Sequence, residues 1–253
     1  MRLTAHTRSP TNVDEENPYW ISFSDLMSAL LVIFILASLA LIIELTQRTQ
    51  DIDAGIEELK KAEQARQDIL NEVKEQLAKQ NIKVLIADNE TVIRIPEETL
   101  SFKSGQDLIP NEMIESVKNI GIILHTAIIK NERFKYLDTV FIEGHTDSIP
   151  IKLGKYWSKG NWGLSADRAI TVWKLWREET QLTPTLNELI NHSDENLFSV
   201  SGYAATRRVQ LIEKTSEQRA KNRRIDIRFT VKKPSIEDLE KIKPTVDNPL
   251  LHH

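Results

Sequence analysis

One acidic residue, Asp25, interrupts a largely apolar run that covers residues 20–43. An acid near the centre of a membrane-spanning helix costs about 2.5–3.5 kcal/mol, so such residues are usually retained for function. Ser24 and Ser28 flank Asp25, and Ser22 lies about one helical turn before it, so these serines form a short polar patch. A carboxylate in such a patch suits alternate binding and release of a cation. The alternatives are that Asp25 reaches the lipid headgroups or pairs with a basic residue of a partner helix.

A second set of polar residues occurs in the C-terminal half, in the segments Gly144-His-Thr-Asp147, Asn161-Trp-Gly-Leu-Ser-Ala-Asp-Arg168 and Asn222-Arg-Arg-Ile. Asp147 and Arg168 are suited to a ligand with an ammonium and a carboxylate, because a guanidinium group binds a carboxylate through two parallel hydrogen bonds. A fold-stabilising ion pair between the two residues is the alternative.

Catalytic and metal chemistry are not indicated. His145 and Asp147 lack a third ligand at suitable spacing, so no metal site and no cofactor are predicted. No Ser/His/Asp arrangement, phosphate-binding loop or pair of catalytic carboxylates can be identified, so the chain is not expected to be an enzyme. The formal net charge of -4 argues against direct nucleic-acid binding, and the absence of cysteine excludes disulfides.

The apolar run predicts one membrane-spanning helix. Its 24 residues would extend about 36 Å as a helix, which is enough to cross a bilayer core of about 30 Å. The run is too long and too far into the chain for a cleaved signal peptide, so we expect a single-pass anchor. Arg2 and Arg8 before the run, against Arg48 after it, weakly favour a cytoplasmic tail over residues 1–19.

Residues 44–81 predict a helical stalk, because the segment has no proline and is rich in Glu, Lys, Gln and Ala. Apolar residues alternate at spacings of four and three, with Glu63 and Arg66 at the two intervening core positions; they are Ile52, Ile56, Leu59, Leu70, Val73 and Leu77. This heptad pattern predicts a parallel dimeric coiled coil. A solitary solvated helix, or a helix folded back on the membrane, is the alternative.

Residues 82–232 predict an α+β domain with helices packed on one mixed sheet, because strand and helix patterns alternate. The expected strands are 84–87, 92–95, 139–143, 198–202 and 225–231, and the expected helices are 111–130 and 165–178. Ser165 is a suitable N-cap for the second helix. Residues 233–253, with three prolines, predict a loosely ordered tail.

The three polar segments, together with Val200-Ser-Gly-Tyr-Ala-Ala-Thr206, resemble the OmpA-like peptidoglycan-binding domain, an α/β sandwich. The resemblance covers about residues 90–231 and is greatest to the B subunits of flagellar stators (MotB). It implies that Asp147 and Arg168 hold the diaminopimelate of the peptidoglycan stem peptide. Asn161, Thr146 and Arg224 match further positions of the motif, although Arg224 is equally suited to a structural role. Because the loop between Asp147 and Arg168 is longer than in many relatives, the resemblance does not define which residues form the rim of the site.

The tract from Trp20 to Ala29 is similar to the Trp- and Asp-containing helix of the same family. This resemblance implies that Asp25 carries H⁺ or Na⁺, that Ser24 and Ser28 line the ion path, and that a ring of multi-span A subunits surrounds a homodimer in the bacterial inner membrane. The C-terminal domain would then be periplasmic and anchored to the wall.

Within this superfamily, the acidic tail Asp14-Glu-Glu16, the Ser- and Leu/Ile-rich helix and the long stalk resemble the B subunit of the Zorya anti-phage defence system (ZorB) more than a flagellar stator. A flagellar stator subunit and a passive wall anchor remain alternatives. A periplasmic hydrolase is a third alternative, which lacks candidate catalytic residues.

Overall fold

The structure is a computed structural model that describes residues 18–103, 105–151 and 159–233, with only the backbone described for Pro18, Tyr19 and Ile21. The predicted N-terminal tail, including Asp14 to Glu16, lies outside the described residues except for its last two positions. The predicted C-terminal tail also lies outside them, except for its first residue, Lys233, as do Lys152, Lys155 and Tyr156 of the long loop. The chain divides into two compact units, with the boundary between Asp53 and Ala54.

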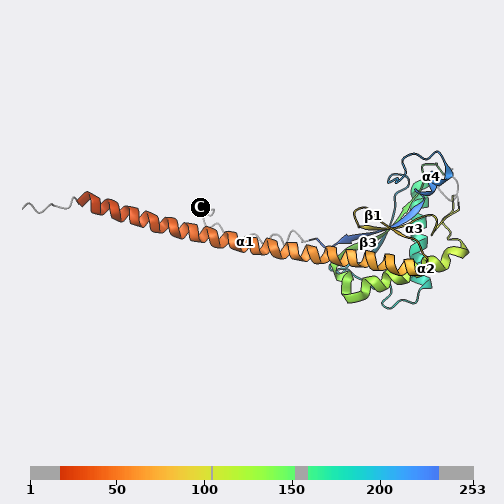
Figure 1. Cartoon of the computed structure of the whole chain (residues 1–253), viewed down its shortest axis with the longest axis horizontal. Helices are drawn as coiled ribbons and strands as arrows, with labels where there is room; N and C mark the ends of the chain where they lie inside the picture. The colour runs from red at the N-terminus through yellow and green to blue at the C-terminus, as the bar shows by residue number, and fades with distance from the viewer. Residues whose placement is uncertain (1–17, 104, 152–158, 234–253) are drawn as a thin grey trace, which may run out of the picture. The chain divides into compact units, whose positions relative to one another are not determined.

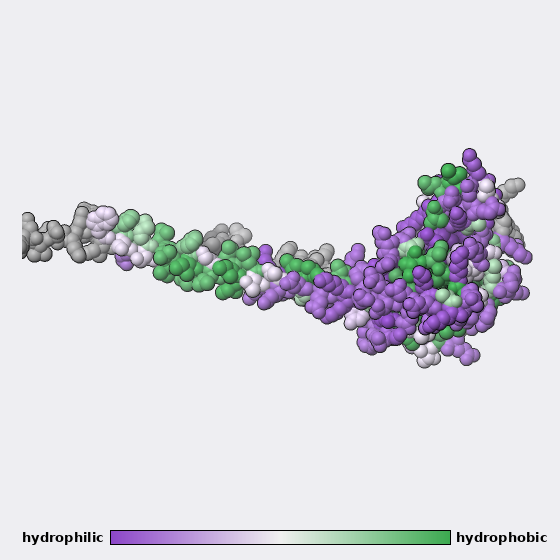
Figure 2. Space-filling view, viewed as in Figure 1, coloured by the Kyte–Doolittle hydropathy of each residue, from purple (hydrophilic) through white to green (hydrophobic). Residues whose placement is uncertain are grey.

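Helix α1 extends without interruption from Pro18 to Lys79 (Figure 1). The predicted membrane segment lies in the part of α1 that belongs to the first unit. Its side chains are almost all exposed, and Figure 2 shows apolar side chains over this part of the helix. Among the described residues, α1 is the one helix that is long and apolar enough to cross a membrane, judged by length and composition. The predicted helix over residues 20–43 is therefore confirmed as a helix.

The second unit contains a mixed five-stranded sheet, as the α+β prediction requires. Its strands are β1 (Leu85–Ala87), β2 (Val92–Ile95), β3 (Leu137–His145), β4 (Phe198–Gly202) and β5 (Arg224–Val231), in the spatial order β1-β2-β5-β3-β4. Strands β3 and β4 are parallel and the other neighbours are antiparallel. Every predicted strand is present. Strand β3 is longer than predicted at both ends, so it carries His145 within the sheet.

The helices that follow are α2 (Asn111–Ile129), the 3-10 segment η1 (Lys130–Tyr136), α3 (Gly160–Glu179) and the short α4 (Ser216–Ala220). The predicted N-cap at Ser165 is wrong, because α3 begins five residues earlier, at Gly160. Ser165 is fully buried inside the helix, where its hydroxyl donates to the Trp162 carbonyl at 3.0 Å and accepts from the Ala204 N–H at 3.0 Å. The serine therefore joins α3 to the loop after β4.

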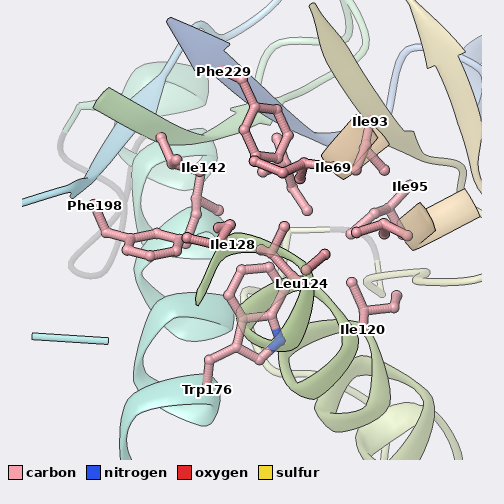
Figure 3. Close-up of a cluster of buried hydrophobic side chains, with 14 of the residues drawn as sticks. Ile69, Ile93, Ile95, Ile120, Leu124, Ile128, Ile142, Trp176, Phe198 and Phe229 are labelled. Carbon is pink, nitrogen blue, oxygen red and sulfur yellow. The ribbon is translucent and has the colours of Figure 1, made fainter. Parts of the chain in front are cut away.

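The core lies between one face of the sheet and the helices, and Figure 3 shows residues from α1, α2, α3 and the strands meeting there. Trp176 of α3 is fully buried, and its indole N–H donates to the Val117 carbonyl of α2 at 2.7 Å. The inward residues of β5 alternate with polar ones, as expected for a sheet with one apolar face.

The final turns of α1 belong to this core, which corrects the predicted coiled coil. Leu70, Val73 and Leu77 are fully buried against the domain of the same chain, so they are not available for a seam between two chains. The first half of the pattern remains exposed, with Ile56 at 46% and Leu59 at 38%. Heptad spacing and the apolar face of a helix packed on a sheet are the same pattern over two turns, which is why the sequence did not separate them.

Candidate functional site

A cavity of about 600 Å³ opens in the second unit where the ends of β3 and α3 meet the loop before β5. It brings together four of the five residues that the motifs predicted for ligand binding: Thr146, Asp147, Asn161 and Arg168. Its other polar and charged lining residues are Glu97, Ser216, Arg219 and Arg223. The pocket therefore combines residues from four separate segments of the sequence and carries both signs of charge.

The guanidinium group of Arg168 is fixed in place but has no carboxylate partner among the described residues. Its Nε donates to the Gln106 carbonyl at 3.0 Å and its Nη2 donates to the Lys103 carbonyl at 3.4 Å. The group also lies 4.8 Å from the centre of the Phe102 ring. Burial lowers the pKa of Arg168 to about 10, so the group stays charged at neutral pH. A buried, unpaired guanidinium is a suitable site for a ligand carboxylate.

Asp147 provides the opposite charge in the same cavity. Its Oδ2 accepts a hydrogen bond from Nη1 of Arg223 at 2.8 Å, and its Oδ1 accepts from the Ile149 N–H at 3.1 Å. Arg223 is also held by Glu97 through two hydrogen bonds of 2.8 and 2.9 Å. Burial alone would lower the pKa of Arg223, but its hydrogen bonds to Asp147 and Glu97 raise the pKa above the ordinary value. The two carboxylates thus share one guanidinium.

Asn161 braces the loop that follows Asp147. Its side-chain amide donates to the carbonyls of Asp147 at 3.2 Å and Ile149 at 3.0 Å, and its Oδ1 accepts from the Ile151 N–H at 3.0 Å. The side-chain amide of Asn161 makes all three of these hydrogen bonds to backbone groups, so the geometry favours a positioning role for Asn161. Thr146 lines the cavity and is 3% exposed, and its hydroxyl has no hydrogen-bond partner among the described residues.

The structure does not bring Arg224 to the cavity. Its side chain is buried on the sheet face opposite the helices, where Nε donates to Asp226 at 3.0 Å and Nη2 donates to the Arg207 carbonyl at 3.0 Å. Because side chains alternate along a strand and Ile225 faces the core, Arg224 must face the other way. Of the two roles considered for Arg224, this geometry favours the structural one.

Sequence reasoning missed Glu97, Arg219 and Arg223. Arg223 lies in the Asn222-Arg-Arg-Ile motif, one residue before β5 begins. The alternation of side chains along β5 could have indicated that Arg223, and not Arg224, faces the site. Glu97 carries no comparable signal, because it lies in a loop about 50 residues before the first motif.

A polar cluster on the same sheet face includes Glu143, His145 and Asp226, whose ligand atoms lie within 4.8 Å of one another. Their carboxylate oxygens are already hydrogen-bonded to guanidinium groups, since Arg228 donates to Glu143 and Arg94 donates to both oxygens of Asp226. A divalent cation there would meet these positive charges, so we assign the cluster a structural role. The metal pair considered from sequence, His145 with Asp147, is not the one that the fold assembles.

His145 is buried beneath an aromatic side chain. Its ring stacks on Tyr203 with centroids 5.4 Å apart, and the Arg207 guanidinium lies 3.8 Å from the centre of the Tyr203 ring. Burial, with the nearby charge of Arg224, lowers the pKa of His145 to about 3, so the ring is neutral at physiological pH.

In the first unit, Asp25 and its serines lie on the exposed surface of α1. The hydroxyl of Ser28 donates to the Ser24 carbonyl at 2.8 Å, one turn before it. This bond uses the Ser28 hydroxyl hydrogen within the helix. The lone pairs of the Ser28 oxygen are therefore available to a cation or to a donor on a neighbouring helix.

No protein-family model matches the chain, but several known proteins are similar to it in sequence. The chain is 32% identical over 131 residues to Motility protein B of Bacillus subtilis, an alignment that covers 52% of this chain and 42% of that protein. It is 25% identical over 249 residues to the uncharacterized protein YtxE of the same organism, covering 89% and 93%. It is 26% identical over 138 residues to the Zorya protein ZorB of Escherichia coli, covering 53% of each.

The chain therefore spans about half the length of two of these relatives and nearly all of the third. Two solved structures are also similar. The periplasmic domain of Helicobacter pylori MotB is 20% identical with a TM-score of 0.47, covering 63% of this chain and 89% of that one. The cell wall anchor of the T6SS from Pseudomonas aeruginosa is 23% identical with a TM-score of 0.45, covering 66% and 99%. With TM-scores below 0.5, neither structure identifies a function.

Over about half of its length, the chain is therefore similar in sequence to MotB-like proteins. The narrower similarity to ZorB has weaker support, because it is 26% identical over about half of each chain.

Proposed function

We propose that this protein is the B subunit of an ion-driven motor of the bacterial inner membrane, anchored to peptidoglycan by the cavity around Asp147 and Arg168. The observation that carries the proposal is the unpaired guanidinium of Arg168 in the same cavity as the carboxylate of Asp147. A site with these two charges complements an amino acid end group that carries an ammonium and a carboxylate. The diaminopimelate of a peptidoglycan stem peptide is such a group.

Each charge has a defined ligand in this proposal. Among the described residues, the Nη1 atom of Arg168 has no hydrogen-bond acceptor. The two carbonyls that hold Nε and Nη2 orient the group, so a ligand carboxylate would meet a fixed donor. Each oxygen of Asp147 accepts one hydrogen bond and retains a lone pair for the ligand ammonium. Asn161 holds the loop after Asp147 in place, and Thr146 supplies a hydroxyl at the wall of the cavity.

The membrane part of the proposal rests on α1. Asp25 would carry H⁺ or Na⁺, with Ser24 and Ser28 lining the path, and the N-terminus would be cytoplasmic with the domain in the periplasm. The acid would face a ring of multi-span A subunits around a homodimer, because an acid on a lipid-facing surface would be costly. Neither nucleic-acid binding nor an enzymatic activity is part of this role.

The similarities to Motility protein B and to ZorB support two settings for the same machine. We favour anti-phage defence, on the acidic tail and the Ser- and Leu/Ile-rich helix, and keep a flagellar stator as the second candidate. If the protein were instead a passive wall anchor, its function would require the cavity but would not require Asp25.

The test separates the two sites in one full-length protein. Asp147→Asn and Arg168→Lys are expected to lower co-sedimentation of the detergent-solubilised chain with purified sacculi about tenfold each, since each removes a charge-assisted contact. Asp25→Asn should sediment like wild type and yet abolish protection in a phage challenge of cells that carry the complete system.

Glu98→Gln, at an exposed neighbour of the cavity, and Asp51→Asn, on the exposed part of α1 beyond the apolar run, are the matched controls. Wild-type binding by the Asp147 and Arg168 variants would overturn the anchoring role. Full protection by Asp25→Asn would overturn the motor and leave the passive anchor.

A further inference from the structure

The pairing of Arg223 determines which charges of the cavity remain available to a ligand. Three arginines, Arg168, Arg219 and Arg223, line the cavity against the two carboxylates of Glu97 and Asp147. Among the described residues, Arg219 donates to the carbonyls of Glu213 and Lys214 and has no carboxylate partner. Positive charge is therefore in excess, and the partner that Arg223 takes decides whether the carboxylate of Asp147 is available to a ligand.

Glu97 is the better partner of Arg223. The two side chains form parallel hydrogen bonds, Nε to Oε1 at 2.8 Å and Nη2 to Oε2 at 2.9 Å, whereas Asp147 receives a single bond from Nη1. A two-bond guanidinium–carboxylate pair is stronger and more directional than a single bond. Both side chains are about one-fifth exposed, so the pair keeps some contact with water. The Glu97–Arg223 pair is thus close to neutral as a unit.

We propose that Glu97 is a specificity-determining residue, which holds Arg223 so that the carboxylate of Asp147 remains available to the ammonium of the ligand. Without Glu97, the charge of Arg223 would be satisfied only by Asp147, and the cavity would favour ligands that carry a carboxylate alone. This inference rests on the proposed function, because it assumes that the ligand is the amino acid end of a stem peptide.

The experiment uses the full-length chain in detergent and two soluble muropeptides. One carries meso-diaminopimelate with its free side-chain amino group, and the other carries the same residue with that amino group acetylated. Wild type is expected to bind the free amine about tenfold more tightly, the effect of one charge-assisted hydrogen bond. Glu97→Gln is expected to lose most of this preference through weaker binding of the free amine, with little change for the acetylated ligand.

Glu98→Gln is the matched control, because Glu98 is the next residue, is exposed and pairs with Lys83 at 2.7 Å outside the cavity. The second variant is the double change Glu97→Gln with Arg223→Gln. It removes the competing guanidinium, so the preference for the free amine should return to within about threefold of wild type, which loss of structure at Glu97 would not produce.

A Glu97→Gln variant that keeps the full preference would overturn the inference. So would a double variant as poor as the single one, or an Arg223→Gln variant that loses the free amine, because Arg223 would then contact the ligand itself. If Glu97→Gln does not fold, Arg223→Gln alone still decides, since retention of the preference is expected. Failure of the proposed function looks different: wild type would then bind neither muropeptide, and Asp147→Asn would change nothing.

Discussion

Arg223 and Arg224 are adjacent in the chain, yet their guanidinium groups contact different carboxylates in different parts of the domain. Arg223 reaches Asp147 in the cavity at 2.8 Å, whereas Arg224 reaches Asp226 on the sheet face away from the helices at 3.0 Å. The reversal of direction arises because β5 begins at Arg224, where the alternation of the strand fixes the side chain. One residue of the pair therefore serves the site and the other serves the fold.

This division predicts different effects on stability. Arg224→Gln leaves the buried Asp226 with one guanidinium partner fewer and is expected to lower the free energy of unfolding by about 2–3 kcal/mol. Arg223→Gln is expected to cost less than about 1 kcal/mol, because its ion pairs are partly exposed to water. Urea denaturation of the full-length chain in detergent measures both values. Equal losses would show that the two arginines are not divided in this way.

The buried end of α1 predicts a contrast between two leucines of one helix. Leu77→Ala removes a fully buried side chain from the domain core and should lower the free energy of unfolding by about 2–5 kcal/mol. Leu59→Ala, at a position that is 38% exposed, should cost less than about 1 kcal/mol. The same denaturation experiment compares them. A small loss at Leu77 would indicate that the final turns of α1 do not belong to the domain, as the coiled-coil prediction supposed.

The sequence identified the elements of the domain because their local patterns are unambiguous. Strand alternation located β5 and β4, and the apolar face of Asn111–Ile129 located α2. It also placed Asp147 and Arg168 in one site, since both stand in recognised motifs. The burial of Leu70 and the pairing of Glu97 with Arg223 depend on contacts between distant segments, which no local pattern encodes.

Close packing between α3 and the sheet predicts that Gly144 cannot be replaced. A Cβ atom at Gly144 would lie 1.9 Å from the Ser165 carbonyl oxygen, so α3 would have to move away from β3. Gly144→Ala is expected to lower the free energy of unfolding by more than about 3 kcal/mol and to weaken sacculus binding, because Asp147 and Arg168 each follow one of the two contacting residues by three positions.

Gly55→Ala is the matched control for this effect. No atom lies within 4 Å of a Cβ built at Gly55, which is within α1, so alanine should stabilise the helix by up to about 1 kcal/mol. A Gly144→Ala variant as stable as Gly55→Ala would show that the helix and the sheet can separate without loss.

The buried imidazole of His145 predicts a loss of stability in mild acid. Because burial and Arg224 lower its pKa to about 3, the ring stays neutral in the native protein below pH 6.5, whereas the unfolded chain binds a proton there. The neighbouring carboxylates of Glu143 and Asp226, at 3.9 and 3.4 Å, favour protonation but do not overcome this effect. Stability should therefore fall as the pH falls, by up to about 1.4 kcal/mol per unit below pH 6.5.

The measurement is the free energy of unfolding between pH 7 and pH 5, a range in which most carboxyl groups remain ionised in both states. His145→Asn should be less stable at pH 7 but should lose part of the slope, and His125, whose pKa is also lowered by burial, accounts for a further part. His192→Asn, at an exposed histidine, should retain the slope of the native protein. An unchanged slope in His145→Asn would mean that the imidazole accepts a proton within the fold, with Glu143 and Asp226 as its partners. The stack of His145 on Tyr203 would then tolerate a charge.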